Sequence, residues 1–401
     1  MTVRATARGA ERTSLDGERA DVLICGASFA GLAVARELAL AARRDGVAPP
    51  DVLVLDRYEI GERATSACAA PAPWLRALGV EDAICQELPH MSFSTPHGRV
   101  RYRLPWSWAS FDYRRLCTLL WEQCGSARFA TAVVHGRTGD VVHTDRGDVT
   151  APLLVDACGW RRVLADPHYQ PPDAPLSRGL EVHPHDVRAA DETALDLWIE
   201  RSLVRRGYGW SVPAGGERRV GTCSYDPAQH VKEPTRRLAD RLAVEQVRYQ
   251  GNWFPHRLRT ATEDGAFFVG DSAGHCFPLS GEGIRTAFYF GIACGRELAA
   301  VAAGRRTRAE ALARYAAFHD RHTGAYRRAL ALQRVVPALP PRVLSLLLRV
   351  IGVQKLVDRA FGWYLDQAHP ALADAAGAPA AARPEDLQHG RRPAPRPVPR
   401  R

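Results

Sequence analysis

The chain has 401 residues, of which 46% are hydrophobic, and it can therefore bury a sizeable core in one or two domains. Its formal net charge of +10 comes mostly from arginine, but no basic stripe interleaved with aromatic residues accompanies that charge, so nucleic acid is not an expected partner. The nine irregularly spaced cysteines form no C-x-x-C pair, and the N-terminus has no apolar leader, which favours a cytoplasmic protein without a metal site.

Residues 1–19 are polar and aperiodic, and we expect them to be disordered. A strand–helix–strand unit follows, with apolar runs at 21–25 and 51–57 around a helical period at 29–44. The loop inside it, "ICGASFAGLA" at 24–33, departs from G-x-G-x-x-G because serine stands at the second glycine position. Serine is still small, so this loop is predicted to bind a pyrophosphate through Gly26, Ala27, Ser28, Ala30 and Gly31.

An acidic residue at the end of the second strand supports this prediction. Asp56 lies 25 positions after Gly31, where its carboxylate can accept hydrogen bonds from ribose hydroxyls, and Arg57 next to it is a further candidate for cofactor binding. On this stretch alone, a structural strand–helix turn without ligand remains the alternative.

Further along the chain the pattern changes twice. Residues 90–115 and 176–225 alternate loosely and carry many aromatic side chains, which predicts an antiparallel sheet in a second domain. The helical period returns from 287 to 318 and from 342 to 365, and the Ala/Pro/Arg-rich residues 371–401 are expected to form a disordered tail.

The stretch "GAFFVGDSAGHCFPLSGEGIRTAFYF", starting at Gly265, places an acid after a buried strand, then a proline-containing loop and a glycine-flanked helix start. It resembles the second flavin-binding motif of the FAD-dependent oxidoreductases related to aromatic hydroxylases and to geranylgeranyl reductases. The resemblance implies that Asp271, after Gly270, holds the ribityl chain of FAD. The helix start can stabilise negative charge on a reduced flavin. The matching loop positions are Pro278, Ser280, Gly281, Glu282, Gly283 and Ile284.

Two other segments resemble cofactor-binding parts of these families less closely. In "LLVDACGWRRVLA", at 153–165, Cys158 replaces the first residue of an Asp-Gly pair, which argues against hydroxylase-like capture of NADPH and leaves Gly159 beside the adenine end. The helix in "FDYRRLCTLLWEQC" resembles the one whose arginine reaches the cofactor, which implies Arg114, although the usual spacing would place Tyr113 there. A surface arginine is the alternative.

The stretch "RGYGWSVPAGGERRVGTCSY", at 206–225, is similar to the aromatic-x-Trp-x-x-Pro segment that lines the lipid pocket of geranylgeranyl reductases. The resemblance assigns Tyr208, Trp210 and Pro213 to that pocket. The segment "IGERATSACAAP" resembles the one in which a cysteine lies near the flavin, so Cys68 is a candidate proton relay. The alternatives are that Trp210 is only a core aromatic residue of the sheet and that Cys68 is only a buried apolar cysteine.

The resemblance as a whole implies an α/β fold with three parts. The FAD-binding, Rossmann-like domain comprises 20–90, 114–175 and 255–320. The antiparallel-sheet substrate domain comprises 91–113 and 176–254, and 321–370 form a helical C-terminal region.

The implied activity is hydride transfer from reduced FAD to a carbon–carbon double bond of a small apolar, isoprenoid-like substrate. The alternatives are an FAD-dependent monooxygenase and a flavin-binding protein without turnover. Because there is only one phosphate loop, NAD(P)H is expected to bind transiently, or a protein donor supplies the electrons. The basic, leucine-rich segment 342–365 suggests peripheral contact with a membrane, and a helix that closes the substrate domain is the alternative.

Overall fold

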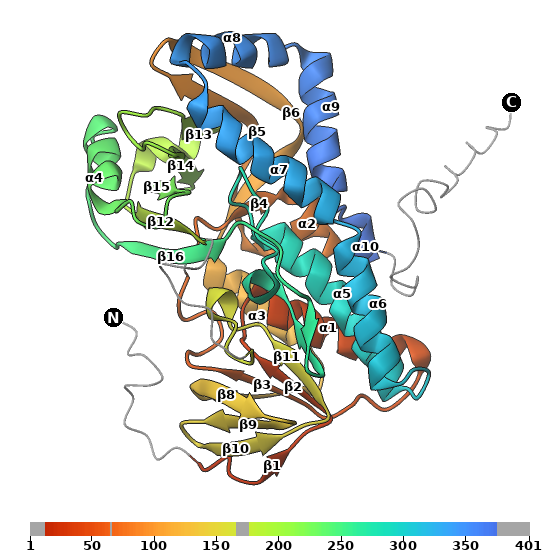
Figure 1. The fold of residues 1–401 in the computed structure, drawn as a ribbon. Coiled ribbons are helices and arrows are strands. Elements are labelled where there is room, and N and C mark those ends of the chain that lie inside the picture. Colours follow the sequence, from red (N-terminus) through yellow and green to blue (C-terminus); the bar gives the residue numbers. More distant parts are fainter. Residues whose placement is uncertain (1–12, 65, 166–175, 375–401) are drawn as a thin grey trace, which may run out of the picture.

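The strand–helix–strand unit predicted near the N-terminus lies at the centre of a six-stranded sheet (Figure 1). The computed structural model describes residues 13–64, 66–165 and 176–374. Five strands of this sheet run parallel, and the edge strand β17 pairs antiparallel with its neighbour. In sheet order the strands are β17 (Thr262–Glu263), β18 (Ala266–Phe268), β11 (Leu153–Asp156), β2 (Val22–Cys25), β3 (Val52–Asp56) and β7 (Arg128–Thr131).

Both faces of the parallel sheet are covered, which is why its strands are continuously apolar in the sequence. Val22 and Ile24 pack toward the helices on one face, whereas Leu23 and Cys25 pack toward a four-stranded sheet on the other. That small sheet is built, in order, from β1 (Glu18–Arg19), β10 (Gly147–Thr150), β9 (Val141–Thr144) and β8 (Val134–Thr138). Residues 13–19, expected in a disordered terminus, thus include a strand, whereas 1–12 and 375–401 lie outside the described residues.

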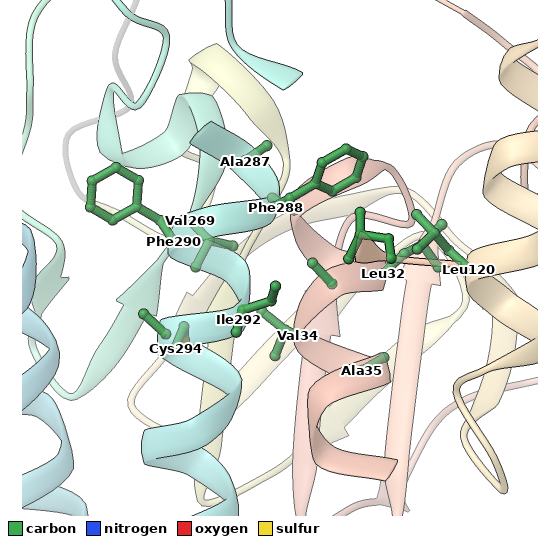
Figure 2. Packing of buried hydrophobic residues seen from close by; sticks show 14 of the residues in the cluster. Leu32, Val34, Ala35, Leu120, Val269, Ala287, Phe288, Phe290, Ile292 and Cys294 are labelled. Atoms are coloured by element: carbon green, nitrogen blue, oxygen red, sulfur yellow. The ribbon is translucent and has the colours of Figure 1, made fainter. Parts of the chain in front are cut away.

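Helices α1 (Phe29–Asp45) and α5 (Ile284–Ala302) cover the helical face side by side, and Figure 2 shows Ile292 of α5 beside Val34 of α1. Glycines allow this close approach. A Cβ on Gly291 would lie 2.8 Å from the carbonyl oxygen of Ala30. A buried ion pair, 2.8 Å between Arg296 Nε and Glu37 Oε1, links the same two helices farther along. The N-termini of α1 and α5 are therefore held in a fixed relation to each other.

The second domain is an eight-stranded sheet, as the loose alternation predicted. All neighbouring strands in it pair antiparallel except β5 and β13, which are parallel. It also takes in β4 and the first part of β5, which had been expected in the FAD-binding domain. In sheet order the strands are β16 (Gln250–Pro255), β12 (Leu176–Val182), β15 (Glu217–Ser224), β14 (Gly207–Ala214), β13 (Ala194–Trp198), β5 (Ile84–Thr95), β6 (Gly98–Phe111) and β4 (Ala69–Pro71).

The two long helical periods are each interrupted. The chain leaves α5 at Ala302, and Thr307 then caps α6 through a reciprocal capping box with Glu310. The segment expected as one helix at 342–365 is two helices, because Gly352 ends α8 and Val353 is extended. The remaining helices are α2 (Ala72–Ala77), α3 (Tyr113–Glu122), α4 (Lys232–Arg241), α6 (Arg308–Asp320), α7 (Thr323–Val335), α8 (Pro341–Ile351), α9 (Gln354–Asp366) and α10 (Ala371–Asp374).

Candidate functional site

One large cavity, with a volume of about 1370 Å³, extends from the loops of the parallel sheet to the C-terminal helices. One end is lined by the loop at 26–30, by residues 55–59 after β3 and by residues 157–159 after β11. The middle is lined by Gly270, Asp271 and residues 279–284. The other end is lined by apolar side chains of the eight-stranded sheet and of α7, α8 and α9. The cavity therefore combines a groove with polar side chains and an apolar chamber in one continuous space.

The loop between β2 and α1 has the backbone geometry of a phosphate loop. Gly26 has a φ of 117°, and a Cβ there would lie 2.3 Å from the carbonyl oxygen of Ala157, so only glycine fits. A Cβ on Gly31 would lie 1.9 Å from the Gly26 oxygen, which explains why this glycine packs behind the loop instead of lining the cavity.

Serine at the second glycine position is compatible with this geometry. Ser28 is the N-cap of α1, yet within the described residues its side chain makes no capping bond, and its hydroxyl accepts a hydrogen bond from Tyr113 Oη (3.0 Å). The first N–H groups of α1 are therefore left for an anion in the cavity, as at other helix N-termini that bind phosphate.

Asp56 ends β3 and lies at the wall of the cavity. Its Oδ2 accepts the N–H of Ala27 (2.8 Å), and its Oδ1 accepts the N–H of Tyr58 (3.0 Å). Burial raises the pKa of Asp56, and these two backbone bonds partly offset that effect. Each carboxylate oxygen keeps a second lone pair, so Asp56 can also accept ribose hydroxyls. Arg57, which lines the cavity beside it, lies over the ring of Tyr58.

The segment after β11 is held together by Asp156. This buried carboxylate accepts the N–H groups of Cys158 (2.9 Å) and Leu164 (2.7 Å) and the hydroxyl of Ser272 (2.6 Å). Gly159, with a φ of 80°, lines the cavity as predicted for a residue at the adenine end. Asp156 therefore joins the two loops that lie on either side of it and does not itself face the cavity.

Asp271, after β18, also lines the cavity, but its hydrogen bonding differs from that of Asp56. Gly270 has a φ of 63°, and a Cβ there would lie 2.9 Å from Ala30 Cβ, so the loop lies tightly against the start of α1. The Asp271 carboxylate accepts no hydrogen bond from the residues that the structure describes. Burial raises its pKa to about 6, although Arg259 acts in the opposite direction. Hydroxyl donors from a ligand would satisfy this carboxylate.

The loop before α5 forms the middle wall. Gly281 has a φ of 63°, and Gly283 is the N-cap of α5. In the first turn of the helix, the N–H of Arg285 donates to Glu282 Oε1 (2.8 Å). Glu282 pairs with the fully buried Arg285 (Oε2 to Nε, 2.5 Å), and Tyr364 Oη donates to Ser280 Oγ at 3.0 Å. Gly281, Glu282, Gly283 and Ile284 line the cavity, whereas Pro278 does not line it.

The apolar chamber begins directly beyond this loop. Tyr208 Oη donates to the carbonyl oxygen of Ser280, so the aromatic strand β14 is joined to the loop. Trp210 lines the chamber, and its Nε1 donates to Glu181 Oε2 (3.0 Å). Pro213 lies nearer the end of the β14–β15 hairpin, opposite Arg218, and the cavity wall among the described residues does not include it.

Five predicted residues do not line the described cavity wall: Gly31, Pro213 and Pro278, described above, and Cys68 and Arg114. Cys68 is buried and has a φ of 49°, its Sγ donates to the carbonyl oxygen of Ser66 (3.1 Å), and burial raises the pKa of the thiol to about 12. Arg114 is exposed on α3, and Tyr113, in the position that the family spacing indicated, lines the cavity instead. Within the described residues, neither the Cys68 thiol nor the Arg114 guanidinium faces the cavity.

The structure also brings in polar residues that sequence reasoning missed. Glu181 lies on β12 in the chamber wall and accepts hydrogen bonds from His183 (2.8 Å), Gln250 (2.6 Å) and Trp210. Burial acts to raise its pKa, but the bond from His183 and the others outweigh burial and lower it. Tyr364, on α9, faces the chamber from the opposite side. No local motif marks either residue, because Glu181 is bonded to Trp210 and Gln250 of other strands and Tyr364 is bonded to the loop before α5.

Comparisons with known proteins agree with this architecture. No protein-family model matches the chain. Digeranylgeranylglycerophospholipid reductase 3 of Methanosphaera stadtmanae is 25% identical over 162 residues, a match that covers 38% of this chain and 41% of that protein. The matched segment therefore spans about two fifths of the length of this curated relative.

Solved structures match over most of the chain. The geranylgeranyl bacteriochlorophyll reductase-like protein of Thermoplasma acidophilum superposes with a TM-score of 0.74 at 16% identity, covering 89% of this chain and 98% of that one. PqsL of Pseudomonas aeruginosa, a probable FAD-dependent monooxygenase, has a TM-score of 0.62 at 16% identity, covering 82% of this chain and 99% of the other. These similarities confirm the predicted α/β fold, which this chain shares with a geranylgeranyl bacteriochlorophyll reductase-like protein and with a probable FAD-dependent monooxygenase.

Proposed function

We propose that this chain is an FAD-dependent oxidoreductase that reduces a carbon–carbon double bond of an apolar substrate. The observation that carries this proposal is the continuity of the cavity, which leads from the phosphate loop past the N-terminus of α5 into an aromatic, apolar chamber. The partial sequence similarity to a digeranylgeranylglycerophospholipid reductase supports the same substrate class. FAD, when bound and reduced by an electron donor, would supply the hydride for the reduction, and a proton taken up from water would complete the addition of two hydrogen atoms.

The residues present fit FAD at each point of the polar groove. The first N–H groups of α1 would hold the pyrophosphate, and the Gly26 backbone leaves room for its close approach. Asp56 would accept the ribose hydroxyls, and Asp271 would accept those of the ribityl chain. Both carboxylates have free acceptor capacity on the cavity side, as the hydroxyl-rich part of FAD requires.

The start of α5 would stabilise negative charge on the reduced ring system. The positive end of its dipole faces the cavity beside Gly283 and Ile284, although the N–H of Arg285 in the first turn is already bonded to Glu282 Oε1. The nearby Glu282 carboxylate would oppose that effect if it were unpaired. Its ion pair with Arg285, which has 0% relative exposure, neutralises it.

The chamber would bind the substrate and exclude water. Trp210 and Tyr208 form one wall, and Phe361 and Tyr364 of α9 contribute to another. Glu181 is held as an anion by three donors, so it does not present a free charge to an apolar chain. A hydrocarbon segment with double bonds matches these walls, whereas a strongly polar substrate would lose hydration without compensation.

The electron donor for FAD is part of the proposal. The sequence contains one dinucleotide-binding loop, so NAD(P)H would visit the site transiently, or a redox protein would deliver the electrons. Rapid bleaching of the flavin by NADH or NADPH in the absence of oxygen would support the first route.

A second candidate function is an FAD-dependent monooxygenase that hydroxylates or epoxidises an apolar or aromatic substrate. The fold similarity to PqsL favours it, because that protein is itself a probable FAD-dependent monooxygenase. The cysteine at position 158, in place of the hydroxylase aspartate, argues against it.

Product analysis separates these possibilities. The FAD-loaded protein would be incubated with a reductant and a prenyl alcohol, with and without oxygen, and the product mass would be measured. We expect the addition of two hydrogen atoms in both atmospheres. Addition of one oxygen atom, only when oxygen is present, would establish the monooxygenase. Bound FAD that no donor reduces would indicate a flavin-binding protein without turnover.

A further inference from the structure

The exposed large apolar side chains of this protein are concentrated on the C-terminal helices. Of the fourteen such residues in the described part of the chain, ten lie between positions 332 and 363. A soluble surface rarely gathers apolar side chains in this way unless something covers them. They are Leu332, Val335, Val343, Leu346, Leu347, Val350, Ile351, Val353, Leu356 and Trp363.

Helix α8 is firmly attached by its inner side, and no described residue covers the apolar side chains on its outer side. Leu344 is buried, Ser345 Oγ lies 2.5 Å from Thr95 Oγ1, and Tyr102 Oη donates to the carbonyl oxygen of Leu348 (2.5 Å). Figure 1 shows α8 at the end of the molecule farthest from β1. We call the outer side of α8 and the turn after it the docking face. It consists of Val343, Leu346, Leu347, Val350, Ile351 and Val353.

The charges around the docking face are predominantly positive. Between residues 341 and 360 there are four basic residues, Arg342, Arg349, Lys355 and Arg359, and one acidic residue, Asp358. Since α8 has eleven residues, it is about 16 Å long, too short to cross a bilayer. Within the described ranges, no helix is long and apolar enough to do so. A short, basic helix with one apolar side fits the interface of an anionic membrane.

The docking face also surrounds part of the cavity opening. Leu347 and Ile351 are exposed to solvent and at the same time line the cavity, as does Leu356 at the start of α9. These side chains therefore form an apolar path by which an apolar molecule could pass from this face into the chamber.

We propose that the docking face binds the surface of an anionic lipid bilayer and that substrate enters the chamber from the membrane. The evidence for a membrane as the partner comes from the exposed residues and charges alone. Only the identity of the molecule that enters the chamber rests on the proposed function. A second copy of the chain is the competing occupant. In such a dimer, however, the basic residues of the two copies would face each other and repel.

The test measures co-sedimentation of the FAD-loaded protein with vesicles of phosphatidylcholine, alone or mixed with phosphatidylglycerol. We expect binding to the mixed vesicles that weakens as salt is added, because exposed charges are screened. The double variant L346S/V350S, whose positions do not line the described cavity wall, should bind at least about tenfold more weakly. K355E should lower affinity only for the anionic vesicles.

The matched control is Val187→Ser, which removes an apolar side chain that is 69% exposed in the second domain, away from the docking face. It should bind vesicles like the wild type. Absence of wild-type binding to both vesicle types, or equal binding by L346S/V350S, would overturn the proposal. So would a wild-type dimer that L346S/V350S dissociates without any vesicle binding. Because sedimentation needs no turnover, a vesicle-bound protein that fails to reduce alkenes would reject the proposed function and leave the docking face intact.

Discussion

At the scale of single residues, Asp271 gives the proposed cofactor site a pH dependence. Burial raises the pKa of this carboxyl to about 6, so from pH 4 to 6 the folded protein holds a proton that the unfolded chain has lost, and its contribution to stability falls as pH rises. Ribityl hydroxyls favour the ionised form. Binding of FAD should therefore release a proton, and its affinity should rise roughly tenfold from pH 5 to pH 7.

Titrations of the apoprotein with FAD at several pH values measure this effect. Asp271→Asn should remove the pH dependence, and Asp271→Ala should weaken binding roughly tenfold to a hundredfold. Ser28→Gly is the comparison, because it removes only an acceptor for Tyr113 and restores the commoner small residue. The assignment of Asp271 to the ribityl chain would be refuted if Asp271→Asn kept the wild-type pH dependence. It would also be refuted if Asp271→Ala and Ser28→Gly lost equal affinity for FAD.

Trp210 is expected to serve substrate binding more than folding. Its ring lines the chamber and its N–H satisfies Glu181. Trp210→Ala should leave FAD content intact and lower the rate or affinity for substrate about a hundredfold, from a loss on the order of 3 kcal/mol. Trp210→Phe keeps most of the apolar contact and isolates the bond to Glu181. A large fall in the thermal midpoint with unchanged substrate kinetics would show that Trp210 is a core residue.

Cys68 is expected to have no part in proton transfer. Its thiol donates to a backbone oxygen, and burial raises its pKa to about 12, so it remains protonated at neutral pH. Cys68→Ala should change the rate of substrate reduction by less than about twofold. The rate and the FAD content would be measured together. A tenfold loss of rate at full FAD occupancy would restore the predicted role of Cys68.

The residues that could be predicted are those whose role depends on local backbone. Gly26 and Gly270 adopt positive φ angles in loops whose spacing is visible in the sequence. Glu181 and Tyr364 could not be predicted, because their partners are supplied across the fold. Glu181 is bonded to Trp210, 29 positions away, and Tyr364 to Ser280, 84 positions away.

At the scale of elements, the contact between α1 and α5 is expected to couple folding to cofactor binding. A methyl group on Gly291 would lie 2.8 Å from the Ala30 oxygen, at the N-terminal part of α1 where the pyrophosphate is proposed to bind. Gly291→Ala should separate the helices, cost about 1–3 kcal/mol of stability and weaken FAD binding. Thermal unfolding of the apoprotein and FAD titration measure the two effects.

Gly362→Ala is the matched control for this prediction, since no described atom lies within 4 Å of the added Cβ in the middle of α9. It should be neutral, or stabilising by up to about 1 kcal/mol. If Gly291→Ala behaved in the same way, the proposed coupling between the two helices would be wrong.

The helices and strands could be predicted where the apolar residues keep one spacing along the sequence. The apolar runs at 21–25 and 51–57 and the helix at 29–44 were found within a few residues. The break of the C-terminal segment at Gly352 was not predicted, because the helical period of the sequence continues through it. In the structure Gly352 packs against the ring of Tyr102. The parallel pairing of β5 with β13 was also not visible, since register between strands a hundred residues apart leaves no local signal.

At the scale of the whole molecule, the fold brings a cofactor groove and an apolar chamber into one cavity, with the start of α5 between them. The motifs predicted a strand–helix–strand unit with a phosphate loop and a separate antiparallel sheet, but they placed β4 and the first part of β5 in the wrong sheet. That the chamber is lined by α8 depends on three-dimensional packing and follows only from the structure.

The most direct test of the central claim is anaerobic reoxidation of the reduced flavin. The FAD-loaded protein would be reduced chemically without oxygen and mixed rapidly with a prenyl substrate while the flavin absorbance is followed. The proposed function predicts that the oxidised spectrum returns in proportion to the substrate added, and that Trp210→Ala slows this return. A flavin that stays reduced with every alkene tested, but is reoxidised with substrate turnover once oxygen is admitted, would contradict the reductase and establish the monooxygenase.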